Sequence, residues 1–140
     1  MTTDKPYSIF ETEHYVRPDD VDLFQHVHNS RYFDYVLDAR YQQMREFYKY
    51  PMEEFLEAGF GWVVKSVSIH YKRPLVMGER FLVQTGITSM NSRGCRVHFT
   101  IVKKTGGKIS ADGWFDYALI DKISGKSILV SEEMITRYSI

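Results

Sequence analysis

A dense group of ionisable and amide side chains lies in the segment DDVDLFQHVHNSRYFDYVLDAR, residues 19–40. Three aspartates, at positions 19, 20 and 22, and two histidines, at 26 and 28, precede an aromatic-rich stretch. Carboxylate, imidazole and amide groups act as nucleophiles, general bases and hydrogen-bond donors in hydrolytic reactions. The same residue types also form turns and helix caps, so the segment alone permits both a catalytic and a structural interpretation. We interpret Asp19 and Asp20 as solvated turn residues.

The two histidines are two positions apart, which on an extended segment places both rings on one side and raises the question of a metal site. A third ligand would have to be His70, His98 or a carboxylate, and no spacing typical of a zinc motif links these residues. We therefore predict neither a metal nor a cofactor.

Hydrophobic periodicity predicts the elements that position this segment. Residues 7–17 carry β-formers and predict a first strand. From Tyr32 to Phe47, apolar and aromatic residues return at helical intervals, which predicts one helix of roughly four turns. Asn29 or Ser30 is the expected N-cap of this helix.

Beyond the helix, residues 52–62 predict a short helical or irregular connection, and the period then changes to that of strands. Short turns separate five β-rich runs, at 62–75, 79–90, 95–104, 108–121 and 126–131. Such connections imply antiparallel neighbours, and the alternating apolar positions imply one buried face; these positions are Val83, Thr85, Ile87, Val97, Phe99 and Ile101. We expect a single α+β domain over residues 1–140, with one long helix against a five- to six-stranded antiparallel sheet.

Composition limits the possible partners. Eighteen basic residues balance eighteen acidic ones, which argues against nucleic acid or an anionic membrane surface as a partner. The start MTTDKPYSIF lacks the features of a signal segment, no later run is apolar enough to span a membrane, and Cys95 is the single cysteine, so a cytoplasmic location is expected. One helix covers only part of such a sheet, which predicts a homodimer or homotetramer.

The segment DVDLFQHVHNSRYFDYVLDAR resembles the opening motif of the hotdog-fold acyl thioesterases. SIHYKRPLVMGERFLVQTGI and ADGWFDYALIDKISGKSILVSEEM resemble later strands of that family, so the resemblance covers nearly the whole chain. It is greatest for the 4-hydroxybenzoyl-CoA thioesterase branch, and DLFQHVHNSRY is also similar to plant acyl-carrier-protein thioesterases. Many family members have glycine where this chain has Gln25, which argues against a positive φ at that position.

The resemblance implies hydrolysis of an acyl-CoA or acyl-carrier-protein thioester, with Asp22 as nucleophile or as the base that activates water. Backbone N–H groups near His28 and Asn29 would stabilise the oxyanion at the helix start. His26 matches the motif histidine and would orient Asp22 or the substrate, and His28 is either substrate-binding or a structural imidazole. Tyr32 matches the motif tyrosine, although its helix face also suits the core.

Further substrate contacts are expected outside the motif. Trp62 and Val63 resemble the stretch that enters the acyl site from a neighbouring subunit, and ordinary packing explains them equally well. Lys72, Arg73 and Arg93 lie at strand ends where they would bind the phosphates of coenzyme A, or remain solvated surface charges. The alternative to an enzyme is a noncatalytic acyl-thioester binding or scaffold protein that keeps the fold.

Overall fold

A computed structural model of the protein describes residues 7–140. Residues 1–6, which contributed to the expectation that there is no signal segment, lie outside the described part of the chain. The helices and strands are, in chain order, β1 (Ile9–Tyr15), α1 (Tyr32–Glu46), α2 (Met52–Ala58), β2 (Phe60–Tyr71), β3 (Arg80–Asn91), β4 (Gly94–Lys103), β5 (Ile109–Asp121) and α3 (Glu132–Tyr138). Short 3₁₀ turns at Pro18–Asp20 and Asn29–Arg31 precede α1.

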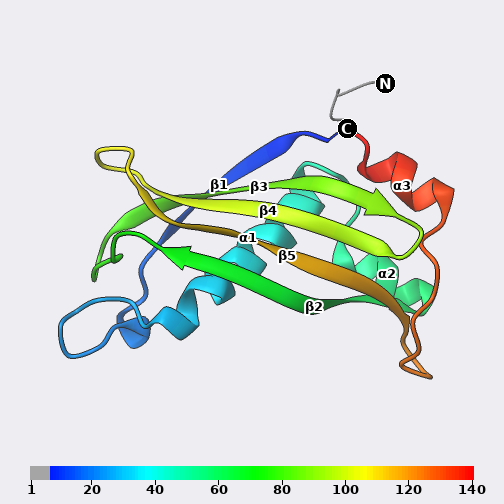
Figure 1. Ribbon diagram of the computed structural model, residues 1–140, viewed down its shortest axis with the longest axis horizontal. Helices are drawn as coiled ribbons and strands as arrows, with labels where there is room; N and C mark the ends of the chain where they lie inside the picture. Colours follow the sequence, from blue (N-terminus) through cyan, green and yellow to red (C-terminus); the bar gives the residue numbers. More distant parts are fainter. Residues whose placement is uncertain (1–6) are drawn as a thin grey trace.

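The strands form one antiparallel sheet in the order β1-β3-β4-β5-β2 (Figure 1). The predicted sixth strand at 126–131 was wrong, because that segment joins the sheet only through a bridge between Ser127 and Ile120. Val130 then turns away to bond the carbonyl of Ser92, and Ser131 caps α3 by accepting a hydrogen bond from the N–H of Met134. The chain leaves the sheet here because a helix begins immediately.

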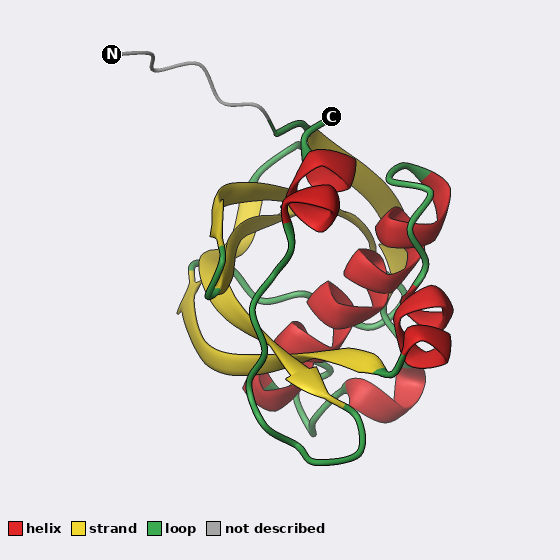
Figure 2. Cartoon of the chain, turned by 90° about the vertical axis from the view of Figure 1, so that its right-hand side faces the viewer, coloured by secondary structure: helices red, strands yellow, loops and turns green. Residues whose placement is uncertain are grey.

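The sheet curls around α1, which lies in its concave face (Figure 2). The expected alternation is confirmed: the inward side chains of β3 and β4 are all buried, namely Val83, Thr85, Ile87, Val97, Phe99 and Ile101. α1 contributes a buried face that includes Tyr35, Val36 and Ala39. The α+β arrangement of one long helix against an antiparallel sheet is therefore confirmed.

The helix start differs from the expected one. Residues 29–31 form a 3₁₀ turn that continues directly into α1, and neither His28 nor Arg31 makes a side-chain cap hydrogen bond. Asn29 and Ser30 therefore lie inside the helical turn and are not N-caps. α2 confirms the short helical connection, whereas α3 was not predicted. Within residues 7–140, no helix combines the length and apolar character needed to cross a membrane.

Polar side chains are buried between α1 and the sheet. Arg40 and Gln43 are 2% and 0% exposed. An Arg40 Nη1–H donates to Thr85 Oγ1 (3.1 Å), and the Thr85 hydroxyl donates to Gln43 Oε1. Gln43 Nε2 donates in turn to Thr12 Oγ1 and to the carbonyl of Val83, both at 3.1 Å. These bonds satisfy the Gln43 amide and one nitrogen of Arg40, while Arg40 Nε has no hydrogen-bond partner among the described residues.

The same row of hydrogen bonds ends at a histidine near the surface. Thr12 Oγ1 lies 2.9 Å from His14 Nε2, and His14 Nδ1 lies 3.6 Å from the exposed Asp38 carboxylate. Burial lowers the pKa of His14, while Asp38 and Glu13 oppose the change, so the neutral ring is favoured. From Arg40 through Thr85 and Gln43 to Thr12, each member of the row donates to the next.

Candidate functional site

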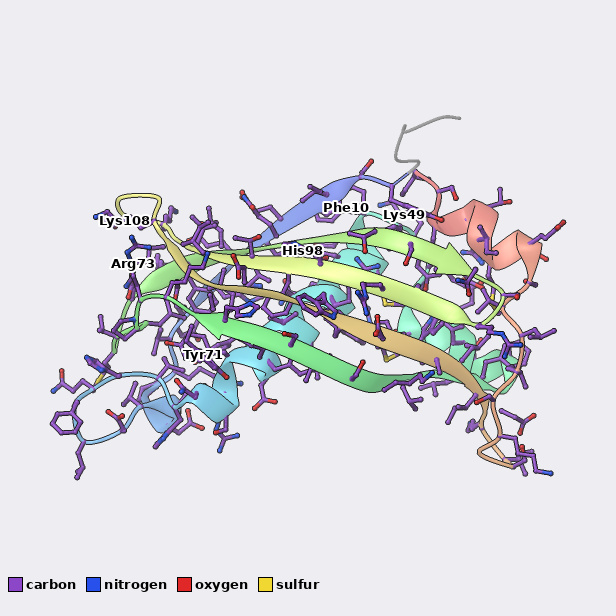
Figure 3. The ribbon with its side chains drawn as sticks, viewed as in Figure 1. Phe10, Lys49, Tyr71, Arg73, His98 and Lys108 are labelled. Carbon is purple, nitrogen blue, oxygen red and sulfur yellow. The ribbon has the colours of Figure 1, made fainter. Side chains whose placement is uncertain are left out.

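A cleft of about 450 Å³ lies where the loop before α1 meets the end of β2. Its lining comprises Asp22, His26, Val27, His28, Asn29, Tyr32, Tyr71, Lys72, Arg73 and Pro74. Tyr71 and Arg73 lie at the same end of the molecule in Figure 3. The cleft therefore gathers seven of the ten residues predicted from the sequence and leaves out Trp62, Val63 and Arg93.

Asp22 occupies a tight turn whose backbone its own carboxylate supports. Oδ1 accepts hydrogen bonds from the N–H of Phe24 (2.8 Å) and of His26 (3.1 Å). In the described residues, Oδ2 accepts no hydrogen bond and remains available to a ligand in the cleft. Desolvation opposes ionisation, but the two N–H donors, with His26 and His28 close by, lower the pKa of Asp22 below its ordinary value. The carboxylate is thus charged at neutral pH, with Oδ1 bonded within the turn and Oδ2 unbonded.

Asp20 is buried, contrary to its interpretation as a solvated turn residue. It is 2% exposed, and its carboxylate accepts from the hydroxyl of Tyr35 (2.6 Å) and from Arg17 Nε (2.9 Å). Arg31 Nε lies 3.6 Å away. Desolvation raises the pKa of Asp20, but these partners outweigh it and lower the pKa overall. Burial also raises the pKa of Tyr35 to about 12, so the phenol keeps the proton that it donates.

The backbone at the helix start narrows the choice of oxyanion donors. The N–H of His28 donates to the carbonyl of Asp20 (2.9 Å), so it is not free. The N–H of Asn29, the first residue of the helical turn, bonds no acceptor in the described part of the chain. Free N–H groups of a first turn point out of the helix end and favour negative charge. The geometry therefore favours the Asn29 side of the predicted pair.

Tyr71 is a member of the cleft that the sequence prediction missed. Its hydroxyl donates to the carbonyl of Asn29 (2.9 Å), which ties the end of β2 to the helix start. Its ring meets Tyr32 edge-on with centroids 5.2 Å apart. Tyr32 itself is 2% exposed, and its hydroxyl accepts from the N–H of Leu75 (2.9 Å), so it belongs to the core and to the cleft wall. The only signal for Tyr71 was its place just before the Lys72–Arg73 pair.

The two motif histidines both line the cleft and are exposed. The histidines considered as further metal ligands lie on other parts of the sheet: His70 is 3.8 Å from Asp112, and His98 projects from the middle of β4 (Figure 3). Among residues 7–140, no group of three potential metal-ligating side chains was found. The cleft histidines are thus placed to contact Asp22 or a ligand.

The predicted phosphate-binding cations fall into two places. Lys72 and Arg73 lie in the cleft, where Lys72 pairs with Asp112 (3.1 Å) and Arg73 donates to the carbonyl of Ile109 (2.9 Å). Arg93 lines a separate hollow on the far turn between β3 and β4, together with Lys65. The structure brings only the first two cations to the same cleft as Asp22.

Trp62 and Val63 lie far along β2 from the cleft of the same chain. Trp62 Nε1 donates to the hydroxyl of Tyr138 (3.3 Å), and its ring packs near Phe55 at 5.8 Å. Val63 is 38% exposed beside it. Trp62 therefore packs within its own chain. It could line the cleft of Asp22 only in a second copy of the protein.

Gln25 has a left-handed backbone, with φ 63°, so the expectation that this residue argues against a positive φ was wrong. Hydrogen bonds on both sides hold the conformation: the N–H of Gln25 donates to the carbonyl of Asp22 (2.9 Å), and its carbonyl accepts from the N–H of Met77 (3.0 Å). A non-glycine residue in this region is strained. The turn that carries Asp22 therefore persists without glycine, at a cost in stability.

Comparison with known proteins places these features in context. A family model for the thioesterase-like superfamily matches residues 16–137. The chain is 23% identical to the long-chain acyl-CoA thioesterase FadM of Escherichia coli (strain K12), over 89% of this chain and 92% of that protein. Its structure is similar to that of the probable thioesterase YbaW of Escherichia coli, with TM-score 0.79, 22% identity and coverage of 92% and 96%. It is also similar to the DHNA-CoA thioesterase of Staphylococcus aureus, with TM-score 0.85, 18% identity and coverage of 95% and 89%. These likenesses confirm the hotdog fold.

Replacing Gln25 by glycine should relieve the left-handed strain and raise the free energy of unfolding by about 1 kcal/mol. The same replacement at Gln42, inside α1, is the matched control and should lower it by about 1 kcal/mol. Urea unfolding of both variants measures the two changes. A loss of stability in Gln25→Gly would contradict the strain assigned to this turn.

Proposed function

Because the chain belongs to the thioesterase-like superfamily, we propose that it hydrolyses an acyl-CoA thioester to a free acid and coenzyme A, with Asp22 as the catalytic carboxylate. The observation that carries the proposal is the position of Asp22 at the cleft. One carboxylate oxygen is fixed by the turn and the other is free beside the start of the helix. The relatives named as acyl-CoA thioesterases support the substrate class.

In the proposed reaction, the thioester carbonyl lies between Asp22 and the N–H of Asn29. Asp22 attacks the carbonyl carbon to give a mixed anhydride that water hydrolyses, or it takes a proton from water as that water attacks. In both cases the carbonyl oxygen becomes negative, the helix N-terminus stabilises that charge, and the carbon–sulfur bond breaks to release the thiol. The lowered pKa of Asp22 keeps its carboxylate charged at neutral pH, as both routes require.

We also propose that Lys72 and Arg73 bind the phosphates of coenzyme A. Both side chains are exposed and lie in the same cleft as Asp22. With the thioester bond at Asp22, the nucleotide of coenzyme A would extend past these two cations. The existing contacts of Lys72 with Asp112 and of Arg73 with the Ile109 carbonyl hold the two cations in place before a ligand arrives. Arg93 lies in a different hollow and is not part of this proposed subsite.

The active unit is proposed to be a homodimer paired through β2. Among the strands of residues 7–140, this edge strand pairs with β5 alone, and its apolar side chains Val64 and Val67 are 36% and 45% exposed. Antiparallel pairing of two copies about the middle of Phe60–Tyr71 would bring Trp62 of one copy beside the end of β2 in the other, where Tyr71 lines the cleft. Trp62 and Val63 would then serve the acyl site of the partner.

Asp22→Asn should keep the turn, because the amide oxygen can accept the same two N–H bonds, and should remove the charge that attacks or accepts a proton. Thiol release under saturating acyl-CoA should fall at least about 100-fold, with little change in the thermal midpoint. Asp19→Asn, at an exposed neighbour, is the control and should retain turnover. Near-normal turnover in Asp22→Asn would refute the role of Asp22. Wild-type protein that binds a nonhydrolysable analogue but releases no thiol would favour the noncatalytic alternative.

Neutralising Lys72 and Arg73 with Lys72→Met and Arg73→Gln should raise KM for acyl-CoA by roughly fivefold per residue, since a partly exposed charge contact contributes about 1 kcal/mol. Turnover of a short pantetheine thioester, which lacks the nucleotide, should be nearly unchanged. Arg93→Gln is the control and should alter neither substrate. Equal losses on both substrates would indicate damage to the fold and not a lost phosphate contact.

A charge at the centre of the β2 edge should separate the proposed dimer, because Val67→Glu would bring two carboxylates together near the symmetry axis. Sedimentation at micromolar concentration should show a monomer with greatly reduced turnover. Ile123→Glu, at a residue 96% exposed on a turn outside this edge, should remain dimeric and active. A fully active monomer would contradict the shared site.

A further inference from the structure

Tyr71 is the last residue of β2, and its side chain reaches from that edge strand to the start of α1. Its hydroxyl donates to the carbonyl of Asn29 (2.9 Å), and its ring meets the ring of Tyr32, the first residue of α1, edge-on at 5.2 Å. Although Tyr71 is 46% exposed, two independent contacts therefore hold its side chain against the helix start, at the wall of the cleft.

The backbone that follows Tyr71 is fixed to the neighbouring strand. The N–H groups of Lys72 and Arg73 both donate to the carbonyl of Ser110, at 2.8 and 3.0 Å, and the Ser110 hydroxyl donates to the carbonyl of Arg73 (2.7 Å). Tyr71 itself pairs with Ala111 in the register of β2 and β5. The hydroxyl of Tyr71 thus projects from a rigid part of the sheet, which is the kind of support that a precisely built site needs.

The turn that Tyr71 contacts carries the proposed oxyanion donor. The N–H of Arg31 donates to the carbonyl of His28 (2.9 Å) and closes the 3₁₀ turn. That carbonyl belongs to the same planar peptide unit as the N–H of Asn29, so the closed turn sets the direction in which this N–H points. The next carbonyl, that of Asn29, is the one that Tyr71 holds. Among residues 7–140, no other side chain forms a hydrogen bond to the backbone of residues 28–31.

This restraint acts on a segment that has little other support. Residues 29–31 are exposed, and no side-chain hydrogen bond caps the start of their turn. An oxyanion donor is effective only if it already points at the charge that develops in the transition state, and a displacement of about 1 Å can cost on the order of 100-fold in rate. Tyr71 supplies, from the sheet, a restraint that the side chains of the turn do not provide.

We therefore propose that Tyr71 is a positioning residue for thioester hydrolysis: its hydroxyl holds the 3₁₀ turn in the orientation in which the N–H of Asn29 meets the carbonyl oxygen of the substrate. This inference rests on the proposed function. In this role Tyr71 acts through the backbone of Asn29 and contacts neither the leaving thiol nor the attacking group. Loss of the hydroxyl slows the chemical step and leaves substrate binding unchanged, because the negative charge on the carbonyl oxygen develops only in the transition state.

Tyr71→Phe keeps the ring that contacts Tyr32 and removes only the hydroxyl. Its kcat on an acyl-CoA should fall about tenfold, while KM and the affinity for a thioether analogue that lacks the carbonyl oxygen should stay within about twofold of wild type. Tyr15→Phe is the matched control and should retain full turnover, because Tyr15 is also the exposed last residue of an edge strand. An unchanged kcat in Tyr71→Phe, or a raised KM with kcat retained, would overturn the proposal.

A second measurement separates positioning from a general loss of structure. In Tyr71→Phe, the NMR order parameters of the Asn29 and Ser30 amides should fall, whereas those of the rest of α1 should not change. The thermal midpoint should fall by no more than about 5 °C, as expected for one lost hydrogen bond. Unchanged order at these two amides, or an equal loss of order throughout α1, would contradict the assigned role.

The outcome for Asp22→Asn distinguishes this inference from the proposed function. Normal turnover in Tyr71→Phe beside an inactive Asp22→Asn would refute the role of Tyr71 alone. A wild-type protein that releases no thiol would refute the proposed function and this inference with it.

Discussion

The buried carboxylate of Asp20 fixes the loop before α1 to the body of the molecule. A charge this deep is tolerated only when its partners are in place, and those partners come from the segment after β1, the 3₁₀ turn before α1 and the first turn of α1. The carbonyl of the same residue accepts from the N–H of His28, so backbone and side chain hold the loop together. The distance between Asp22 and the start of the helix depends on this anchor. The buried carboxylate of Asp20 therefore positions Asp22, the carboxylate proposed to act on the substrate.

The curl of the sheet imposes a second requirement, on α1. A helix enclosed by a concave sheet buries more than a narrow apolar stripe, and α1 accordingly brings Arg40 and Gln43 inside. Thr85 and Thr12 on the sheet and His14 near its edge match them with hydrogen bonds. The interior thus combines an aromatic core, which supplies most of the apolar burial, with a row of hydrogen-bonded polar side chains that fixes the position of the helix on the sheet.

Local patterns predicted much of this structure from the sequence. In β3 and β4, every second residue is buried, and in the helix from Tyr32 onward the buried residues recur at helical spacing. Both patterns arise because one face of the element is buried, so they can be read from the order of apolar residues alone. The burial of Asp20, however, depends on side chains that come from separate elements, and nothing in the local sequence distinguishes it from Asp22, two residues further on. The left-handed Gln25 depends on a bond from Met77, over fifty residues away. The seven residues of α3 are too few for a periodic signal, and its start ended the strand that was expected at 126–131.

The one-way order of the core hydrogen bonds has a consequence for how the sequence can diverge. Thr85 and Gln43 each accept from one neighbour and donate to the next, so replacing Gln43 by a residue that only accepts, or Thr85 by one without a hydroxyl, leaves two neighbours unmatched at once. We therefore expect positions 12, 14, 40, 43 and 85, which lie on three different elements, to be inherited as a set. Among descendants of this chain, they should either be retained together or be exchanged together for an apolar core, with mixed combinations eliminated by selection.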